Sequence, residues 1–447
     1  MLSTEDSGAF MRVLLLEDFN TRIVVIGTML LGAAAGLIGT FLLLRKRALI
    51  GDVLSHTMLP GIVISFLIFA GLETAKSQTT LLLGAACTAA AGVLVMMFLK
   101  RMTRLAEDAV MALVLGSFFG LGIMALGVVL DSPHGNQAGL ESYIYGKTAS
   151  MTRSDVTTIA VGGLIVVLVV VAMFKEFRLL CFDEAFGASL GHRIRVFDGV
   201  LMSLVILTTL VGIQAVGLIL IIALLVIPPA ASRFWTNDLF ATSMVAMVIG
   251  ALGCWIGVWL SASSPRLPAG ALVVLAQSSL FVVSLIFGFQ HGLLQRVWKS
   301  IHLRRKVDRD HLLRSLYELT DRDGNESSWT IDSICELRSW KPNAVEKLLR
   351  RHLKRGEITQ VSKGRWRLST NGMAEAAAIV RNHRLWEQYL IRYAHLAASH
   401  VDRSADRIEH VLGLEMVNRL EEKLYTGPGS SISSPHPIGT SQEGEVK

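Results

Sequence analysis

The sequence predicts an all-α polytopic membrane protein with about nine transmembrane helices, followed by a soluble winged helix-turn-helix and a second helical region. Of its 447 residues, 52% are hydrophobic, which is a high share for a soluble protein. Up to about Gly288 these residues form stretches of roughly 20, long enough for a helix to cross a hydrocarbon core of ~30 Å. Beyond Gln295 the sequence is charged and typical of a water-soluble domain.

Nine apolar stretches predict the membrane helices, because a helix satisfies its own backbone hydrogen bonds in lipid. Their approximate bounds are 22–44, 50–72, 79–99, 109–130, 156–174, 196–212, 214–232, 238–261 and 268–289. The sixth and seventh are the least distinct pair, since only the short Gly212–Gly217 stretch separates them. No basic segment and small-residue cleavage site precede the first stretch, so we expect it to stay in the membrane.

Basic residues flank alternate ends of these spans and indicate their orientation. The loops after the first, third, fifth and seventh spans carry Arg45, Lys46, Arg47, Lys100, Arg101, Arg104, Lys175, Arg178, Arg193, Arg195 and Arg233. Cytoplasmic loops are enriched in Lys and Arg, so we expect a multi-pass cell-membrane protein with its N-terminus outside and its C-terminal domain in the cytoplasm. The formal charge of +7 therefore does not by itself indicate a nucleic-acid partner.

The C-terminal part changes to the pattern of a small soluble domain. Short amphipathic helices are predicted over Asp310–Leu319, Ile331–Glu336 and Pro342–Lys354, the last ending at a glycine. Ile358–Val361 and Arg365–Leu368 then alternate around a tight turn, as a hairpin does. Three helices and a hairpin are the order of a winged helix-turn-helix. Two further helices are predicted near 371–393 and 399–424, and the last ~20 residues have a disordered composition.

An ionisable pair lies within the second predicted span. Asp52 and His56 are four residues apart, so a helix places both side chains on one face. Such residues are costly in a membrane unless they face water or a partner, and they are functional candidates by default. Their oxygen and nitrogen donors suit Mn²⁺, Zn²⁺ or Fe²⁺. The alternative is a hydrated Asp52 at the interface with His56 hydrogen-bonded to it as a structural contact.

Three segments resemble the membrane subunits of the ABC importers for zinc, manganese and iron. They are Leu44–Asp52 through Pro60-Gly61, Phe182–Gly191 with Asp198-Gly199, and Gln214–Gly217 through Ile227–Ala231. The resemblance covers about residues 20–290. It implies that Asp52 and His56 bind the metal in the translocation path. It also implies three protein partners: an ATPase subunit, an extracytoplasmic metal-binding protein and a second permease chain in a homo- or heterodimer.

The same resemblance assigns the loop after the fifth span to ATPase coupling. The matching residues are Phe182, Asp183, Glu184, Ala185, Gly187, Ala188 and Gly191. The small residues among them are expected to permit close approach of the ATPase. The chain contains no Gly-x-x-x-x-Gly-Lys-Ser/Thr phosphate-binding loop, so we expect a transport subunit that is not itself an enzyme and whose ATP is hydrolysed on another chain.

A second group of candidate ligands lies near the C-terminus. His383 and Glu387 are four residues apart, and Asp402, Asp406, Glu409 and His410 are spaced to share one helical face. Oxygen and nitrogen donors without a thiolate suit a hard or borderline ion such as Mn²⁺. The alternative is a solvated face whose carboxylates pair with neighbouring arginines.

This part of the chain resembles the iron- and manganese-dependent regulators related to the diphtheria toxin repressor. The resemblance runs from about Asp310 to Pro437 and includes Leu316–Leu319, His383–Leu385 and Glu409–Leu412. It places metal ligands at His311, His383, Glu387, Asp402, Asp406, Glu409 and His410. The iron-responsive members have His and Cys where this chain has Asp402 and Asp406, which favours manganese.

The complete prediction is a divalent metal importer subunit, manganese favoured over zinc or iron, with a cytosolic metal-sensing domain. Its segments are an extracytoplasmic N-terminus (1–21), a transmembrane domain (22–290), a basic linker (291–306), a winged helix-turn-helix (307–370), a metal-binding and dimerisation region (371–427) and a disordered tail (428–447). The alternative is a membrane-anchored, metal-dependent transcription regulator. DNA is the less favoured partner, although Lys341, Lys347 and Arg350 of the predicted recognition helix are suited to phosphates.

Overall fold

The computed structural model describes residues 19–69, 78–130, 146, 148–263, 267–323, 328–338, 340–393 and 414–425. The chain divides into two compact units, Met1–Arg296 and Val297–Lys447. Each unit has its own apolar core, and we describe them separately.

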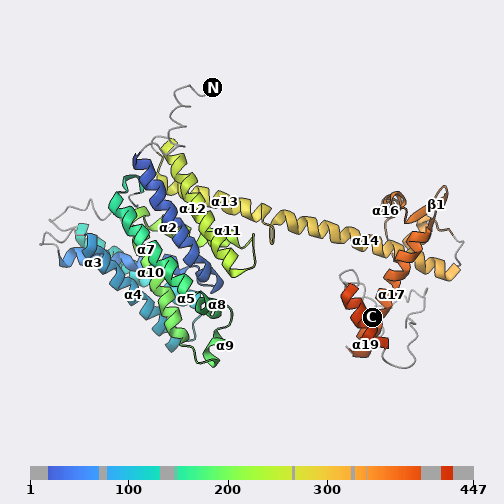
Figure 1. The fold of residues 1–447 in the computed structure, drawn as a ribbon, viewed down its shortest axis with the longest axis horizontal. Coiled ribbons are helices and arrows are strands. Elements are labelled where there is room, and N and C mark those ends of the chain that lie inside the picture. Colours follow the sequence, from blue (N-terminus) through green and yellow to red (C-terminus); the bar gives the residue numbers. More distant parts are fainter. Residues whose placement is uncertain are drawn as a thin grey trace, which may run out of the picture. The chain divides into compact units, whose positions relative to one another are not determined.

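The first unit is a helix bundle (Figure 1). Its long helices are α2 (Phe19–Leu44), α3 (Ile50–Ile68), α4 (Gln78–Met102), α5 (Glu107–Leu130), α7 (Arg153–Ala172), α10 (Ile194–Val216), α11 (Leu218–Ser232), α12 (Leu239–Ser263) and α13 (Ala269–Phe287), with a short 3₁₀ turn at Thr148–Ser150. Eight of them are long and apolar enough to cross a membrane. This confirms the membrane-protein fold class.

The seventh predicted span, 214–232, corresponds to the shorter helix α11. It has 15 residues, which at 1.5 Å per residue is about 22 Å and less than the ~30 Å hydrocarbon core. The break before it lies at Gly217, with φ 85°, so α10 continues four residues beyond its predicted end at position 212. Glycine adopts this backbone conformation without a steric penalty.

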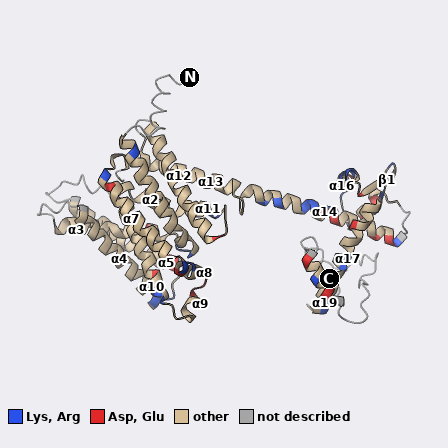
Figure 2. Cartoon of the chain, viewed as in Figure 1, with Lys and Arg blue, Asp and Glu red and all other residues tan. Residues whose placement is uncertain are grey.

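Helix α2 packs against α12, α11 and α7. Gly32 and Gly250 allow the closest approach, because a Cβ added at Gly32 would lie 2.5 Å from the carbonyl oxygen of Gly250. Close contact through small residues is the usual packing of membrane helices. The long sides of the bundle carry few charged residues, and many of its charges gather around α8 (Phe174–Phe182), α9 (Glu184–Ser189) and the start of α10 (Figure 2). We call this the α9 end of the bundle.

The second unit contains helices and one hairpin. Its elements are α14 (Leu293–Asp323, which begins in the first unit), α15 (Ile331–Arg338), α16 (Pro342–Lys354), β1 (Ile358–Ser362), β2 (Arg365–Leu368), α17 (Thr370–Tyr393) and α19 (Leu414–Tyr425). The strands are antiparallel, with Ile358 opposite Leu368 and Gly364 at φ 85° in the turn. The order of α14, α15, α16 and the hairpin agrees with the predicted order of elements.

Helix α14 differs from the prediction of a basic linker (291–306) followed by a short helix. It is one helix of 31 residues, Leu293–Asp323. The reason is local: no glycine or proline occurs in this stretch, so nothing in the sequence stops the helix between the two predicted segments. Part of the last predicted helix, near 399–424, falls outside the described residues, and α19 is its described portion.

Candidate functional site

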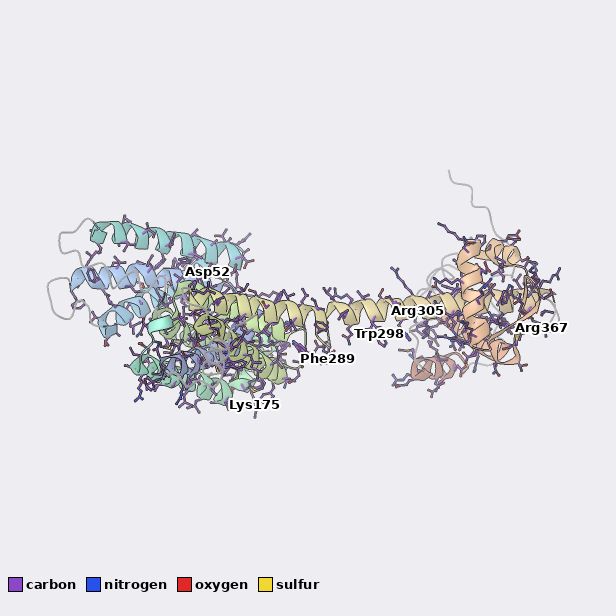
Figure 3. The ribbon with its side chains drawn as sticks, turned by 90° about the horizontal axis from the view of Figure 1, so that it is seen from above. Asp52, Lys175, Phe289, Trp298, Arg305 and Arg367 are labelled. Atoms are coloured by element: carbon purple, nitrogen blue, oxygen red, sulfur yellow. The ribbon has the colours of Figure 1, made fainter. Side chains whose placement is uncertain are left out.

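The first candidate site is the Asp52–His56 pair on α3. Asp52 lies in the first turn of this helix, where a carboxylate interacts favourably with the helix dipole (Figure 3). The Nε2 atom of His56 lies 3.3 Å from Oδ1 of Asp52, and the two side chains are 21% and 33% exposed. The i,i+4 spacing in the sequence therefore produces a direct contact, and both side chains remain partly exposed.

His56 keeps one ring nitrogen without a hydrogen bond. Its Nδ1 atom is buried and has no partner among the described residues, while Phe119 of α5 packs edge-on against the ring at a centroid distance of 4.8 Å. The neighbouring hydroxyls of Ser55 and Thr57 donate to carbonyls of their own helix. A buried polar atom without a partner is costly, so the ring is suited to an additional ligand.

The pair alone is an incomplete metal site. Within the described part of the chain, no three His, Cys, Asp or Glu side chains are grouped closely enough to hold an ion. A divalent ion usually takes four to eight ligands, so about two or more must come from water or another chain.

The second candidate site is the short helix α9, with Asp183 as its cap. The Asp183 carboxylate accepts a hydrogen bond of 2.9 Å from the Phe186 N–H. Most of the predicted coupling residues are exposed: Phe182, Asp183, Glu184, Ala185, Ala188 and Gly191. Gly187 is the exception. It is buried, and an added Cβ would lie 2.8 Å from Ile194 and 2.9 Å from Leu179, so its close approach is to this chain itself.

Two apolar residues beside this cap are not among the predicted coupling residues. Phe186 and Leu190 are 53% and 59% exposed, similar to Phe182 at 63%. Phe182 ends α8, Phe186 lies within α9 and Leu190 is the C-cap of α9, so helical spacing alone could not identify them as one surface. Exposed apolar side chains grouped at the end of a bundle are typical of a protein contact.

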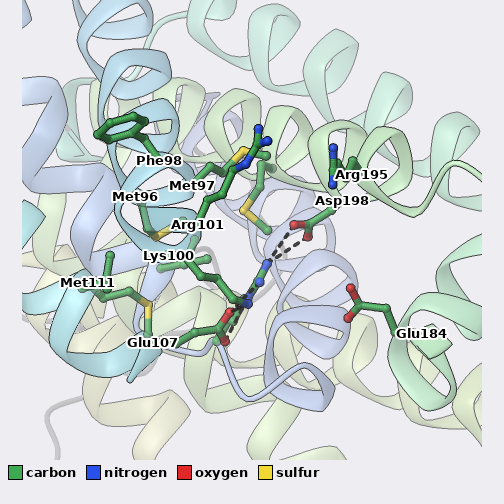
Figure 4. Close-up of a pocket in the computed structure, with 14 residues that line it drawn as sticks. Met96, Met97, Phe98, Lys100, Arg101, Glu107, Met111, Glu184, Arg195 and Asp198 are labelled. Carbon is green, nitrogen blue, oxygen red and sulfur yellow. Dashed lines mark hydrogen bonds and ion pairs between the residues drawn. The ribbon is translucent and has the colours of Figure 1, made fainter. Parts of the chain in front are cut away.

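An ion-pair network that sequence spacing does not predict contacts α9. Arg47 contacts Glu107 of α5 at 2.7 Å and Asp198 of α10 at 2.9 Å. Arg45 contacts the same Asp198, and it lies 3.4 Å from Glu184 of α9. The network thus joins the turn before α3 to α5, α9 and α10. Figure 4 shows the part of it that reaches Glu107 and Asp198.

Both arginines are nearly buried, with side-chain exposures of 6% for Arg45 and 8% for Arg47. Burial alone would lower the pKa of Arg47, but the hydrogen bond to Glu107 and the charge of Asp198 raise it. The network borders a cavity of about 480 Å³. The partners of these arginines lie up to 153 residues away in the chain, so sequence spacing could not identify them.

The third candidate site is the His383–Glu387 pair on α17. The Nε2 atom of His383 lies 3.3 Å from Oε1 of Glu387, and the side chains are 3% and 2% exposed. Arg314 of α14 lies 3.0 Å from Nδ1 of His383 and 2.7 Å from Glu318. Both ring nitrogens of His383 thus have neighbours, one of them a permanent cation.

The other predicted ligands of the second unit are not assembled around this pair in the described residues. His311 lies half-buried on α14, and positions Asp402, Asp406, Glu409 and His410 fall outside the part that the structure describes. Arg314 was not anticipated, although its position three residues after His311 places both on one face of α14.

Comparisons with known proteins agree with this geometry. Residues 18–288 match the profile of the ABC 3 transport family, which is more than half of the chain. The chain belongs to the ABC 3 transport family. It is 33% identical over 382 residues to the manganese transport system membrane protein MntC of Bacillus subtilis, covering 86% of each chain. That length exceeds residues 1–296, so the similarity of this ABC 3 member continues into the second unit.

Two further proteins resemble the first unit. The zinc transport system membrane protein TroC of Treponema pallidum is 38% identical over 293 residues, covering 66% of this chain and 96% of TroC. Among solved structures, PsaBC from Streptococcus pneumoniae in complex with Fab is similar with a TM-score of 0.54 and 25% identity, covering 63% of this chain and 96% of that chain. Both matches cover nearly all of a relative that is shorter than this ABC 3 member.

The second unit has its own match. Residues 369–426 match the profile of the iron dependent repressor, metal binding and dimerisation domain. This segment includes His383 and Glu387, whereas His311 and Arg314 of α14 precede it. The prediction of an ABC permease of the metal type with a C-terminal domain resembling metal-dependent repressors is therefore confirmed.

Proposed function

We propose that this ABC 3 family member is the membrane subunit of an ATP-driven importer for a divalent metal ion. The observation that carries the proposal is the Asp52–His56 pair on the apolar helix α3, whose ring nitrogen Nδ1 has no hydrogen-bond partner among the described residues. Manganese is the favoured cargo, because the similarity to MntC extends over 86% of both chains. Similarity to TroC supports zinc as the alternative, and iron is chemically compatible with the same donors.

Two permease chains complete the metal path in this proposal. One chain offers two donors at Asp52 and His56, so a dimer offers four, and water supplies the rest. An open site with few protein ligands favours transport, because the ion must also leave. An extracytoplasmic metal-binding protein delivers the ion at the end of the bundle opposite α9.

The ATPase subunit docks on α9. The exposed side chains of Phe182, Phe186 and Leu190, which lie just before, within and just after α9, offer apolar contact. Movement of α9 and α10 then reaches the start of α3 through Glu184 and Asp198, which both contact the Arg45–Arg47 turn. This arrangement couples the ATPase to the helix that carries the metal pair. The basic residues at this end support a cytoplasmic location for it and for the C-terminal unit.

The second unit senses cytosolic metal. His383 and Glu387 are the described part of its site, and His311, Asp402, Asp406, Glu409 and His410 are the predicted remainder. The guanidinium of Arg314 lies 3.0 Å from the imidazole of His383. A cation bound at His383 and Glu387 would therefore repel Arg314. Metal binding therefore favours an arrangement in which Arg314 moves, and this population shift is the signal to the pore.

Metal uptake in a strain without its own importer tests the transport function. The chain is expressed with its ATPase and binding protein, and accumulation of Mn²⁺, Zn²⁺ and Fe²⁺ is measured. We expect Asp52→Ala and His56→Ala to abolish uptake while the protein still inserts and co-purifies with the ATPase. His291→Ala is the matched control, because this histidine is exposed and contacts Asn237, away from α3. Normal uptake by both α3 variants would refute the metal path.

A second candidate function is DNA binding by the second unit. Lys341, the N-cap of α16, and Lys347 and Arg350 within this helix are exposed, although Arg350 is paired with Glu346 at 2.7 Å. Full-length protein in detergent would be mixed with its own promoter DNA at physiological salt, with and without Mn²⁺. Sequence-specific, metal-dependent binding that Lys347→Ala weakens would favour the regulator, and binding that salt removes entirely would not.

A further inference from the structure

Helix α14 begins with an amphipathic segment of a particular kind. Five of its first nine residues are large and apolar: Leu293, Leu294, Val297, Trp298 and Ile301. At 3.6 residues per turn these five occupy one arc of about 140°. The opposite arc holds Gln295, Arg296, Lys299, Ser300 and His302. The segment therefore has one apolar face and one basic, polar face.

The apolar face is uncovered. The exposed fractions are 45% for Leu293, 53% for Leu294, 54% for Val297, 68% for Trp298 and 44% for Ile301. Phe287, the last residue of α13, and Phe289 in the connection to α14 are also exposed, at 57% and 71%. Figure 3 marks Phe289, Trp298 and Arg305 along this stretch. Apolar exposure thus continues from the end of a membrane-spanning helix into α14.

We propose that residues 293–302 of α14 lie in the headgroup region of an anionic phospholipid bilayer, with the apolar face turned toward the acyl chains. Such a helix needs a strong apolar face, a basic face and modest overall hydrophobicity, and this segment has all three. Trp298 is of the residue type that prefers the interface. Arg304 and Arg305 follow where the apolar face ends, and their long side chains can extend to phosphates.

Lipid fits this face better than a protein does. A second copy of the same segment would bring two basic helices together. Each basic residue near an anionic surface strengthens binding by about fivefold, whereas a like-charged partner weakens it. The short connection from Phe287 to Leu293 also keeps the segment within a few residues of the bilayer that α13 crosses. The inference rests on membrane insertion alone and does not depend on which ion is transported.

Spin labels on the full-length protein in proteoliposomes test the proposal. Cys87, Cys181, Cys254 and Cys335 are replaced, and one nitroxide is attached at Val297→Cys or at Lys299→Cys on the opposite face. We expect the label at 297 to collide several-fold more with oxygen than with a water-soluble nickel chelate, and the label at 299 to show the reverse. The contrast should be larger in vesicles containing phosphatidylglycerol than in pure phosphatidylcholine.

A label at Val283→Cys on α13 provides the reference for insertion, since Val283 is 47% exposed on a spanning helix. Samples in which it lacks the lipid signal are misfolded and are remade with a milder substitution at the label site. Equal exposure of 297 and 299 to the nickel chelate would overturn the proposal. Spin–spin broadening at 297 would instead identify a second copy as the occupant, and protection that appears only after adding the ATPase would identify that subunit. Either result also overturns the lipid assignment.

Discussion

The membrane unit and the C-terminal unit contain the same chemical pair in different surroundings. In both, a histidine Nε2 lies 3.3 Å from a carboxylate four residues away on one helix. Asp52 and His56 are 33% and 21% exposed, and Nδ1 of His56 has no partner among the described residues. His383 and Glu387 are 3% and 2% exposed, and Arg314 contacts Nδ1 of His383.

This difference fits the proposed division between transport at Asp52–His56 and sensing at His383–Glu387. A translocation site must release its ion, so an open pair with few ligands is appropriate there. A sensor must hold its ion long enough to shift a conformational equilibrium, so burial and a competing internal cation are appropriate. The same two side chains can therefore serve either function, and the environment decides between them.

The largest expected effect is the loss of Mn²⁺ uptake when the Asp52–His56 pair is disrupted. Replacing His56 by Ala removes one of the two donors per chain, and we expect Mn²⁺ uptake to fall by at least about 100-fold. His383→Ala should leave the pore competent and change only how uptake responds to cytosolic metal. Uptake by both variants is measured across external Mn²⁺ concentrations. If the two variants lost uptake equally, the division of roles would be wrong.

The next effect concerns the network that connects α9 to α3. Asp198→Asn keeps the size of the side chain and removes the charge that Arg45 and Arg47 share. Removing one partner of a fully buried ion pair lowers the free energy of unfolding by about 3–5 kcal/mol. Because Asp198 is partly exposed, we expect Asp198→Asn to lower it by about 2 kcal/mol. ATPase activity stimulated by the permease should become independent of transport, while Mn²⁺ binding at Asp52 and His56 persists. Ser203→Ala on α10, whose hydroxyl bonds its own helix, is the control.

The sequence was sufficient for local features and insufficient for distant ones. Apolar stretches identified the membrane helices because lipid imposes their length, and the i,i+4 spacing identified both histidine–carboxylate pairs because a helix imposes it. Arg47, Glu107 and Asp198 are brought together only by the packing of different helices. No local pattern encodes such a meeting, and the same limit applies to Arg314 beside His383.

Two other differences have local causes. The linker 291–306 was predicted from its charge, but charged residues such as Arg and Lys favour helices, and α14 runs through it. Gly187 was expected to permit close approach of the ATPase. Instead, the absence of a side chain at this position leaves room for Leu179 and Ile194 of the same chain. In both cases the residue types alone did not determine the local structure.

A smaller effect, on Mn²⁺ affinity, is expected at the buried His383–Glu387 pair. Arg314→Met removes the cation beside His383 and keeps an apolar chain of similar length. A charge at this distance opposes a metal ion even at a high effective dielectric constant, so we expect affinity of the second unit for Mn²⁺ to rise by about tenfold. Isothermal titration of the full-length protein in a His56→Ala background measures this site alone. Unchanged or weaker binding would show that Arg314 is not a competitor.

The smallest expected effect concerns a third histidine–carboxylate contact, between His352 and Glu357. No metal role is predicted for it, so it shows what such a contact does for stability alone. Nδ1 of His352 lies 2.6 Å from Glu357, and Arg309 also contacts this carboxylate at 2.8 Å. Burial would raise the pKa of Glu357, but the hydrogen bonds from Arg309 and His352 lower it. Burial lowers the pKa of His352, and Glu357 offsets this only in part.

Both folded-state pKa values thus lie below the unfolded ones, so the unfolded chain binds protons more readily. Stability of the second unit should be complete above about pH 6.5, the unfolded value for His, and decline as the pH falls, first through His352 and then below about 4.3 through Glu357. Hydrogen exchange of the hairpin amides in the full-length protein measures this. We expect Glu357→Gln to lower the free energy of unfolding by about 1 kcal/mol at pH 7 and to remove the part of the acid-dependent loss that lies below about pH 4.3. Glu375→Gln, at the exposed end of the same network, should cost less. Equal protection at pH 7.5 and pH 4.5 in the unmodified protein would contradict the assignment for His352, because it would mean that these contacts do not hold its ring neutral in the folded state.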